Sequence, residues 1–253
     1  MKSPIAMLLM LLASPVYALN LGDILDKNQL GKAVAAKQPA ASGNSQALSR
    51  FSNKDQVESL KQALTQGAET AVANLAKPDG FLGNAKVRIP LPENLQKAEG
   101  LMRNFGLGSY ADELTTSMNR AAEAAVPEAK ALLVGAVKKM SVDDAKGILT
   151  GGDDAATQYF RKSTEAALTG KFKPIVGKSM QKVKLAEKYD QFAGKGAQFG
   201  LVDPKDARMD DYITRKALDG LFLMMAEQEK ALRANPLQAT GTLAQKIFSA
   251  IKF

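Results

Sequence analysis

The sequence contains no histidine, no cysteine and no tryptophan. Without histidine and cysteine, Ser-His-Asp and Cys-His catalysis, thiolate chemistry, disulfides and metal sites ligated by imidazole or thiolate are excluded. An enzyme built from this chain would have to use Asp, Glu, Lys, Arg, Tyr, Ser or Thr. A metal would have to be a hard cation held by oxygen. We therefore expect no cofactor, no metal and no catalytic residue, although composition alone does not decide whether the chain is an enzyme.

Long hydrophobic runs are missing beyond the first residues of the chain. Lys2 gives a basic start, residues 5–13 are almost wholly apolar, and small residues at Val16 and Ala18 follow Pro15. This order is typical of a secretory signal peptide and predicts cleavage after Ala18. The apolar run is short for a membrane span, so we expect no transmembrane segment after cleavage. The predicted location is the bacterial periplasm, and secretion into the medium is the alternative.

The chain is basic, with 34 Lys and Arg against 26 Asp and Glu, which gives a net charge of +8. Cleavage would remove Lys2 and leave 8 − 1 = +7. For an exported protein we expect no nucleic-acid partner, and anionic lipids or acidic polymers are the anionic partners available. A net charge of this size also serves solubility by itself.

The composition divides the chain into three parts. Residues 1–18 are the expected signal peptide, and residues 19–48 are expected to form a flexible tail because 37–45 are small and polar, with little to bury. The remaining residues, 49–253, are expected to form one α-helical domain. The full chain is 45% hydrophobic and 24% charged, which is typical of globular proteins.

Apolar residues recur at steps of three and four through this domain, which predicts a succession of helices. Asn53, Ser109, Ser141 and Asp153 stand where side chains cap helix starts, and Gly170 is expected to end a helix. The expected helices are 53–77, 93–104, 109–126, a continuation after Pro127 to Met140, 141–150, 153–168, a stretch around 172–183, 205–233 and 243–251.

The helix expected over about 205–233 is the longest, and Asp203-Pro204 supplies a cap followed by a proline at its start. Its middle, residues 221–226, is apolar on every side, and such a helix is normally buried. We therefore predict an all-α fold, a single multi-helix domain around this central helix. One short strand or hairpin near 85–91 is allowed, at an edge because of the neighbouring prolines.

A cluster of lysines lies between residues 171 and 188. Apolar residues, among them Phe172, Val176 and Met180, are interleaved with them. Such a segment can be a basic amphipathic helix on an anionic membrane surface. The interpretation we favour is a helix with its apolar side in the core and its basic side in water. The candidate anionic-surface contacts are Lys171, Lys173, Lys178, Lys182, Lys184 and Lys188.

The central helix carries polar residues directly before its apolar middle. Arg215 and Lys216 lie four and three residues before Asp219, so either can pair with its carboxylate. The functional interpretation is a polar pocket, and the structural one is an ion pair. The acidic pairs Asp143-Asp144 and Asp153-Asp154 allow a cation site or paired carboxylates, and we favour the interpretation as helix caps.

Five segments together resemble a family of exported bacterial proteins, domain of unknown function 4197. They are KPDGFLGN at 77–84, IPLP at 89–92, MNRAAEAAVPEAK at 118–130, GGDDAATQYFR at 151–161 and DDYITRKALDGLF at 210–222. The resemblance covers about residues 51–253 and implies an α-helical exported domain without an assigned activity. Within these segments, the candidate ligand-binding residues are Arg120, Tyr159, Arg161, Tyr212, Lys216 and Asp219. A network of Arg–carboxylate pairs between helices would explain the same residues.

Three functions follow as hypotheses. The first is a non-enzymatic periplasmic binding protein for an anionic lipid, amphiphile or polymer of the cell envelope, suggested by the ten methionines and the clustered lysines. The alternative is an interaction or scaffolding module whose partner is an envelope protein. The least favoured is a carboxylate-based hydrolase, which would need two carboxyl groups about 5 to 9.5 Å apart in a cleft.

Overall fold

The computed structural model describes residues 50–106, 108–184, 186–190 and 203–235, together with positions 198, 237, 245, 246 and 249. The expected signal peptide and tail, residues 1–48, lie outside the described residues. The helix expected over 243–251 falls almost entirely outside them as well.

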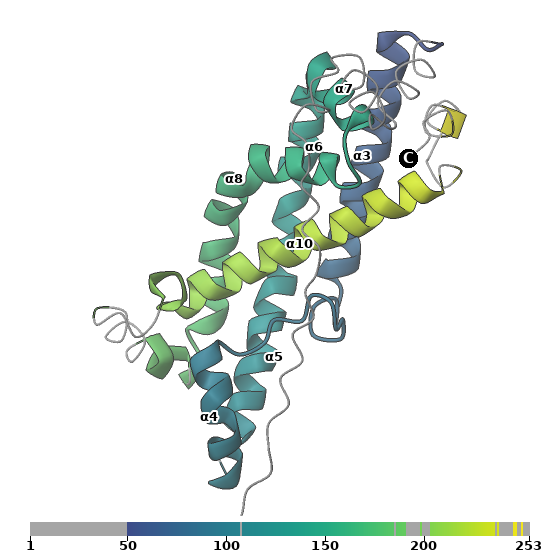
Figure 1. The fold of residues 1–253 in the computed structure, drawn as a ribbon. Helices are drawn as coiled ribbons and strands as arrows, with labels where there is room; N and C mark the ends of the chain where they lie inside the picture. The colour runs from purple at the N-terminus through teal and green to yellow at the C-terminus, as the bar shows by residue number, and fades with distance from the viewer. Residues whose placement is uncertain are drawn as a thin grey trace, which may run out of the picture. The chain divides into compact units, whose positions relative to one another are not determined.

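All regular elements within the described residues are helical, as predicted, and they pack in one domain (Figure 1). They are α3 (Asn53–Ala76), α4 (Glu93–Asn104), α5 (Gly108–Ala125), the 3-10 turn η2 (Val126–Glu128), α6 (Ala129–Lys139), α7 (Val142–Thr150), α8 (Ala155–Met180), the 3-10 turn η3 (Pro204–Asp206) and α10 (Met209–Ala234).

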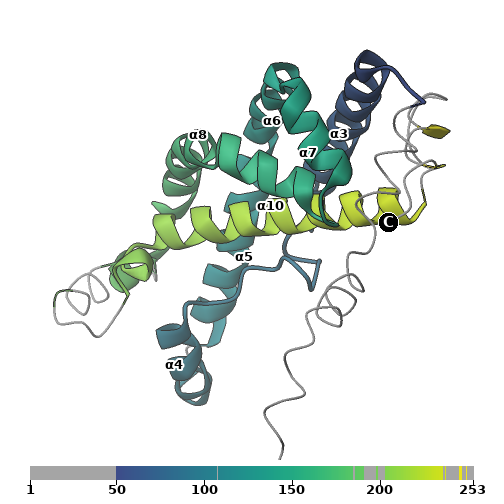
Figure 2. The same cartoon turned by 45° about the horizontal axis from the view of Figure 1, so that its top comes forward.

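Helix α10 is the central element that the sequence predicts. It packs against α8, α3 and α5, and both views show it running across the other helices (Figures 1 and 2). Leu221 and Phe222 on α10 are buried, whereas Leu223 is 43% exposed, so its middle is not buried on every side. In the described part of the chain no helix combines the length and the apolar character that a membrane crossing requires.

The start of α10 differs from the prediction of about residue 205. Asp203 caps the 3-10 turn η3 by accepting a hydrogen bond from the Lys205 N–H. Helix α10 itself begins at Met209, whose N–H donates to Asp190 Oδ1 at 2.6 Å. A carboxylate from the segment after α8 therefore binds the first turn of the central helix.

Of the four caps predicted for the other helices, three are misplaced. Ser52, not Asn53, caps α3 by accepting from the Asp55 N–H, and α5 begins at Gly108, before Ser109. Asp153 does not cap α8, because a carboxylate from another helix bonds the first turn there. Only the capping box of α7 is confirmed, in which Ser141 and Asp144 bond each other's backbone N–H groups.

Helix α8 is continuous where the sequence predicts a break at Gly170. Glycine and proline inside a helix cost about 1 and 3 kcal/mol, yet α8 runs through both Gly170 and Pro174. Its buried residues recur every four positions, and burial of each large apolar side chain contributes roughly 1.5–3 kcal/mol. This row of buried side chains outweighs the local cost. It comprises Phe160, Thr164, Leu168, Phe172, Val176 and Met180.

The strand expected near 85–91 does not form in the described structure. Ile89 is buried, but its backbone bonds a side chain instead of a second strand: its N–H donates to Asn119 Oδ1 at 2.8 Å, and Asn119 Nδ2 donates to its carbonyl at 3.0 Å. Pro90 and Pro92 have no N–H to donate. The side-chain amide of Asn119 on α5 therefore forms the hydrogen bonds that a neighbouring strand would otherwise provide.

The turn after α3 is fastened to α5 and α10. Glu123 Oε1 accepts the N–H groups of Phe81 and Leu82 at 3.0 and 3.2 Å. The Phe81 ring is fully buried against Gly220 of α10, where an added Cβ would lie 2.8 Å from the ring. Glycine at position 220 therefore leaves the space that this phenylalanine fills.

Replacement of Asn119 by alanine is predicted to destabilise the domain strongly. Asn119→Ala leaves a buried N–H and a buried carbonyl of Ile89 without their partner, and each such group costs about 1–3 kcal/mol. We expect urea unfolding to show a loss of about 2–5 kcal/mol. Asn94→Ala, on the exposed side of α4, is the control and should change little. Equal effects of both substitutions would refute the role given to Asn119.

Candidate functional site

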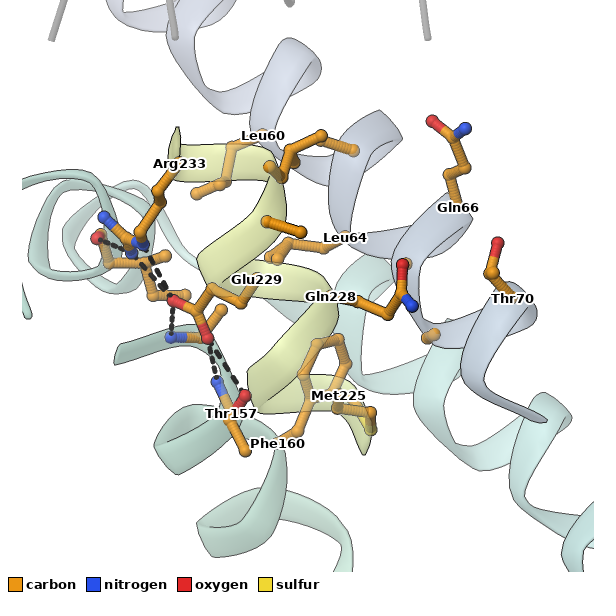
Figure 3. A pocket seen from close by; sticks show the side chains of 17 residues that line it. Leu60, Leu64, Gln66, Thr70, Thr157, Phe160, Met225, Gln228, Glu229 and Arg233 are labelled. Atoms are coloured by element: carbon orange, nitrogen blue, oxygen red, sulfur yellow. Dashed lines mark hydrogen bonds and ion pairs between the residues drawn. The ribbon is translucent and has the colours of Figure 1, made fainter. Parts of the chain in front are cut away.

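An apolar pocket with a volume of about 190 Å³ lies between α3, α8 and α10, near the N-terminus of α8 and the C-terminal half of α10 (Figure 3). Ile148 of α7 contributes to its wall. The lining residues are Leu60, Ala63, Leu64, Gln66, Gly67, Ala68, Thr70, Ile148, Ala156, Thr157, Phe160, Met225, Gln228, Glu229, Ala231, Leu232 and Arg233.

Small residues on α3 make room for this pocket. Ala63, Gly67 and Ala68 lie on the side of α3 that faces it, and a Cβ added at Gly67 would meet no atom within 4 Å. Larger side chains, such as Phe160 and Met225, form the opposite wall. A glycine in the middle of a helix is unfavourable. Gly67 therefore leaves space for the pocket but makes α3 less stable.

A buried carboxylate network closes one side of the pocket. Glu229 Oε1 accepts from the Ala156 N–H at 2.9 Å, and Oε2 accepts from the N–H and the hydroxyl of Thr157 at 2.9 and 3.0 Å. Arg233, one turn later on α10, donates to Oε1 from Nη2 at 2.7 Å and from Nε at 3.2 Å, and it also donates to the Ile148 carbonyl. Glu229 thus caps α8 from another helix.

This network explains why Asp153 does not cap α8. The N–H groups in the first turn of a helix need acceptors, and those of Ala156 and Thr157 are already bonded by Glu229. Asp154 accepts instead from the Gln158 side chain. With two backbone donors, one hydroxyl and an arginine, Glu229 is fully occupied. We interpret it as a structural group and not as an acid or base.

The polar groups on the other side of the pocket are uncharged. Gln66 is exposed, whereas Thr70 and Gln228 are half-buried. Figure 3 shows Gln228 pointing toward α3 beside Thr70, away from the Glu229–Arg233 pair. The pocket therefore combines apolar walls with amide and hydroxyl groups near one edge, an arrangement suited to binding and orienting a ligand.

Two of the sequence candidates, Arg161 and Asp219, are brought together between α8 and α10. The Arg161 guanidinium lies 3.3 Å from Asp219 Oδ1, pairs with Glu165 at 2.8 Å and stacks on the Phe222 ring at 4.5 Å. The expected pairing of Asp219 with Arg215 or Lys216 is wrong: Asp219 pairs with Arg161, and Arg215 pairs with Asp206. An arginine from a distant helix reaches Asp219 in their place.

Tyr212 and Lys216 form a second contact, on α10 alone. The Lys216 ammonium lies 5.8 Å from the centre of the Tyr212 ring, and Arg215 lies 5.5 Å from it. The Tyr212 hydroxyl donates to the Pro90 carbonyl at 3.0 Å. Burial raises the pKa of this hydroxyl to about 12, and the pKa of Tyr189 is raised to about 12 by the same cause.

The remaining candidates, Arg120 and Tyr159, bond other parts of the fold. Arg120 pairs with Glu123 at 2.6 Å and with Asp79 at 2.8 Å, which secures the turn after α3. The Tyr159 hydroxyl donates to the Ala136 carbonyl at 3.0 Å. The six candidates are therefore distributed over separate contacts, and none of them lines the apolar pocket between α3, α8 and α10. These contacts hold parts of the fold together, which is the structural alternative to ligand binding that the sequence leaves open for these residues.

The lysine-rich segment has its apolar side in the core. Phe172, Val176 and Met180 are buried, while five of the six candidate lysines are exposed. Lys173 is half-buried and pairs with Asp211 of α10 at 2.5 Å. The arrangement is that of a packed helix with a basic outer side.

The acidic pairs act locally. Hydrogen bonds from Ser141 lower the pKa of Asp144, as expected for the N3 residue of a capping box. Across the described residues no group of three or more Asp and Glu side chains is placed to hold a metal ion.

Sequence reasoning missed the pocket itself. Glu229 and Arg233 are spaced as a helical ion pair, but the sequence does not show that the carboxylate also caps α8. The available signal for the wall formed by α3 was Gly67, a glycine inside an otherwise strong helix pattern, with Ala63 and Ala68 nearby. An isolated helical glycine has a packing or functional reason in many cases.

Comparison with known proteins confirms the resemblance seen in the sequence. The profile of the family described as "Protein of unknown function (DUF4197)" matches residues 50–249. No curated protein and no solved structure matches the chain.

Removal of the Glu229 carboxylate is predicted to destabilise the fold through two effects. Glu229→Ala uncaps α8 and leaves Arg233 as a buried charge without its carboxylate, and loss of one partner of a buried pair costs about 3–5 kcal/mol. Glu227→Ala, two residues earlier, breaks an exposed pair with Lys86 and should cost at most about 1 kcal/mol. Urea unfolding of the two variants gives the free energies of unfolding to compare. Adding Arg233→Leu to Glu229→Ala should recover part of the loss, and no recovery would contradict the buried-charge explanation.

The raised pKa values of the buried residues Tyr189 and Tyr212 predict that the domain loses stability at alkaline pH. Their pKa is about 12 when folded and about 10 when unfolded, so the unfolded chain releases these protons first. Stability is full below pH 10 and falls as the pH rises through 12, and each tyrosine accounts for roughly 1.4 kcal/mol at pH 11. Relative to its stability at neutral pH, Tyr212→Phe should lose less on alkaline titration than the unmodified protein. Tyr110→Phe, at an exposed position, should not differ from it.

Proposed function

Because the chain belongs to the DUF4197 family of proteins of unknown function, its function must be inferred from its structure, and we propose that it is a non-enzymatic binding protein for an amphiphilic ligand of the cell envelope. The observation that carries the proposal is the apolar pocket between α3, α8 and α10. The ligand's apolar part would occupy the pocket, and its polar head would lie at the edge with Thr70 and Gln228.

The pocket volume limits what can enter. A cavity of about 150 Å³ lined by aliphatic and aromatic side chains accommodates benzene, so about 190 Å³ suits one ring or a short aliphatic chain. Sites for drug-sized molecules measure about 300–1,000 Å³. We infer that the pocket takes the end of an aliphatic chain, with the rest of the molecule outside.

The polar groups limit the head group. The charged pair at the pocket, Glu229 and Arg233, is neutralised internally and engaged with α8 and α7. The amide of Gln228 and the hydroxyl of Thr70 donate and accept hydrogen bonds equally well. They fit a hydroxyl head, which both donates and accepts, better than an ammonium head, which only donates. This specificity, and the location of the ligand in the periplasm, are parts of the proposal.

The scaffolding alternative has one observation in its favour. Phe105, in the turn after α4, is 73% exposed, and Tyr110, in the first turn of α5, is 46% exposed. Exposed aromatic residues are enriched where proteins bind each other. Two exposed residues are a smaller basis than a formed pocket, so we rank this function second.

The hydrolase hypothesis receives less support. A second, more polar cleft of about 360 Å³ contains Asp190 and Asp210, and burial raises the pKa of Asp190. Both carboxylates are nevertheless engaged: Asp190 accepts the N–H that starts α10, and Asp210 pairs with Arg208 at 3.0 Å. Their positions are explained by the start of the central helix.

Substitutions at Gly67 test the binding proposal. Gly67→Phe should fill the pocket with its ring, while Gly67→Ala adds one methyl group in open space and should stabilise α3 by about 0.5–1 kcal/mol. Octanol and octanoate serve as probe ligands. With ¹³C-methyl-labelled methionine, the Met225 signal should shift on addition of either probe, while that of Met118, buried away from the pocket, should not.

The two variants should separate binding from folding. We expect Gly67→Phe to lower probe affinity at least about tenfold, which corresponds to 1.4 kcal/mol, while Gly67→Ala remains close to the unmodified protein. Octylammonium should bind more weakly than octanol. If Met225 does not respond to octanol or octanoate at about 1 mM, a concentration that would reveal even millimolar affinity, the pocket is not an amphiphile site and the proposal fails.

A further inference from the structure

We propose that the outer face of the C-terminal half of α8 adsorbs to anionic phospholipid head groups at a bilayer surface. This interaction is separate from the pocket and does not depend on its ligand. The face comprises Lys171 and Lys178 on α8 and Lys182 in the turn directly after the helix, and we call it the lysine face.

Lys171 and Lys178 share one side of α8, and Lys182 lies in the turn that follows the end of the helix at Met180. A spacing of seven residues returns to the same side of an α-helix and separates the first two charges by about 10 Å along the axis. All three side chains are exposed. Lys184 and Lys188, also exposed, continue the positive charge beyond Lys182. The sequence has no acidic residue between Glu165 and Glu187.

The lysines of this face have no carboxylate partner in the part of the chain that is described. The nearby acidic groups of α10 lie on the other side of α8, where Lys173 pairs with Asp211 at 2.5 Å. Gly177 faces Asp210 there, since a Cβ at 177 would be 3.9 Å from its carboxylate. At 100° per residue, positions 173 and 177 lie roughly opposite Lys171 and Lys178. Its charge is therefore available to an external anion.

The side-chain types favour a diffuse anionic surface over a protein partner. Protein interfaces are depleted in lysine and depend on Trp, Tyr and Arg, and the lysine face contains none of these three. Arginine would also be expected for bidentate recognition of a single phosphate. Lysine acts as a point charge, and lysines near an anionic leaflet each contribute about fivefold in affinity, or about 1 kcal/mol.

The mode of contact also follows from the packing. The apolar residues that could have entered a bilayer, among them Phe172, Val176 and Met180, are buried in the domain. The helix therefore does not insert as an amphipathic helix would, and the attraction is electrostatic alone. Such binding must weaken steeply with salt, since the Debye length falls from about 10 Å at 0.1 M to about 3 Å at 1 M.

Vesicle co-sedimentation of the purified protein tests this proposal. At low salt the protein should bind vesicles of phosphatidylcholine mixed with phosphatidylglycerol and not vesicles of phosphatidylcholine alone. The triple variant Lys171→Gln, Lys178→Gln, Lys182→Gln should bind on the order of 100-fold more weakly. Circular dichroism should show an unchanged fold, because all three side chains are exposed.

A second triple variant controls for net charge. Lys77→Gln, Lys97→Gln and Lys146→Gln remove the same charge from exposed positions after α3, on α4 and on α7, and should retain most of the binding. Three results would overturn the proposal: equal losses in the two triple variants, binding that persists at 1 M salt, or tighter binding to double-stranded DNA than to the anionic vesicles.

Discussion

The segment that links α3 to α4 needs hydrogen-bond partners for its buried backbone, and the rest of the fold depends on this constraint. Residues 77–92 cross the helical domain without forming a helix, and buried N–H and C=O groups in such a segment need partners. Asn119 and Glu123, one turn apart on α5, provide them to Ile89 and to the turn at Phe81. Because this turn is held in place, the Phe81 ring can pack against α10 at Gly220. A polar strip on one helix thus sets the position of the central helix.

The first turns of α8 and α10 also depend on side chains from other segments for their hydrogen bonds. The first turn of α8 is bonded by Glu229 from α10, and the first turn of α10 is bonded by Asp190 from the segment after α8. The two helices are antiparallel neighbours, and near each end a carboxylate joins one to the other. This exchange fixes their alignment, and it places the apolar pocket beside Glu229 while the lysine face remains outside.

The helices were predictable because their apolar spacing is regular, and the capping box at Ser141 was predictable because both of its partners lie within one turn. The wrong expectations share a physical cause. Gly170 did not end α8, and Asp153 did not cap it, because packing and a distant carboxylate outweighed local preference. The pocket was not predictable because its walls come from segments that are far apart in the sequence, and only Gly67 left a local signal.

The bond between Glu229 and the start of α8 joins residues 73 and 72 positions apart, and it has a consequence for how the chain reaches its native state. The element that contacts α3, α5 and α8 is synthesised after all of them. The earlier helices can form as segments, but their shared core closes only when α10 arrives. Contacts of such long sequence separation slow folding compared with bundles of sequential helices. Folding of the domain therefore waits for the synthesis of α10, and the packing of this helix is the closing step.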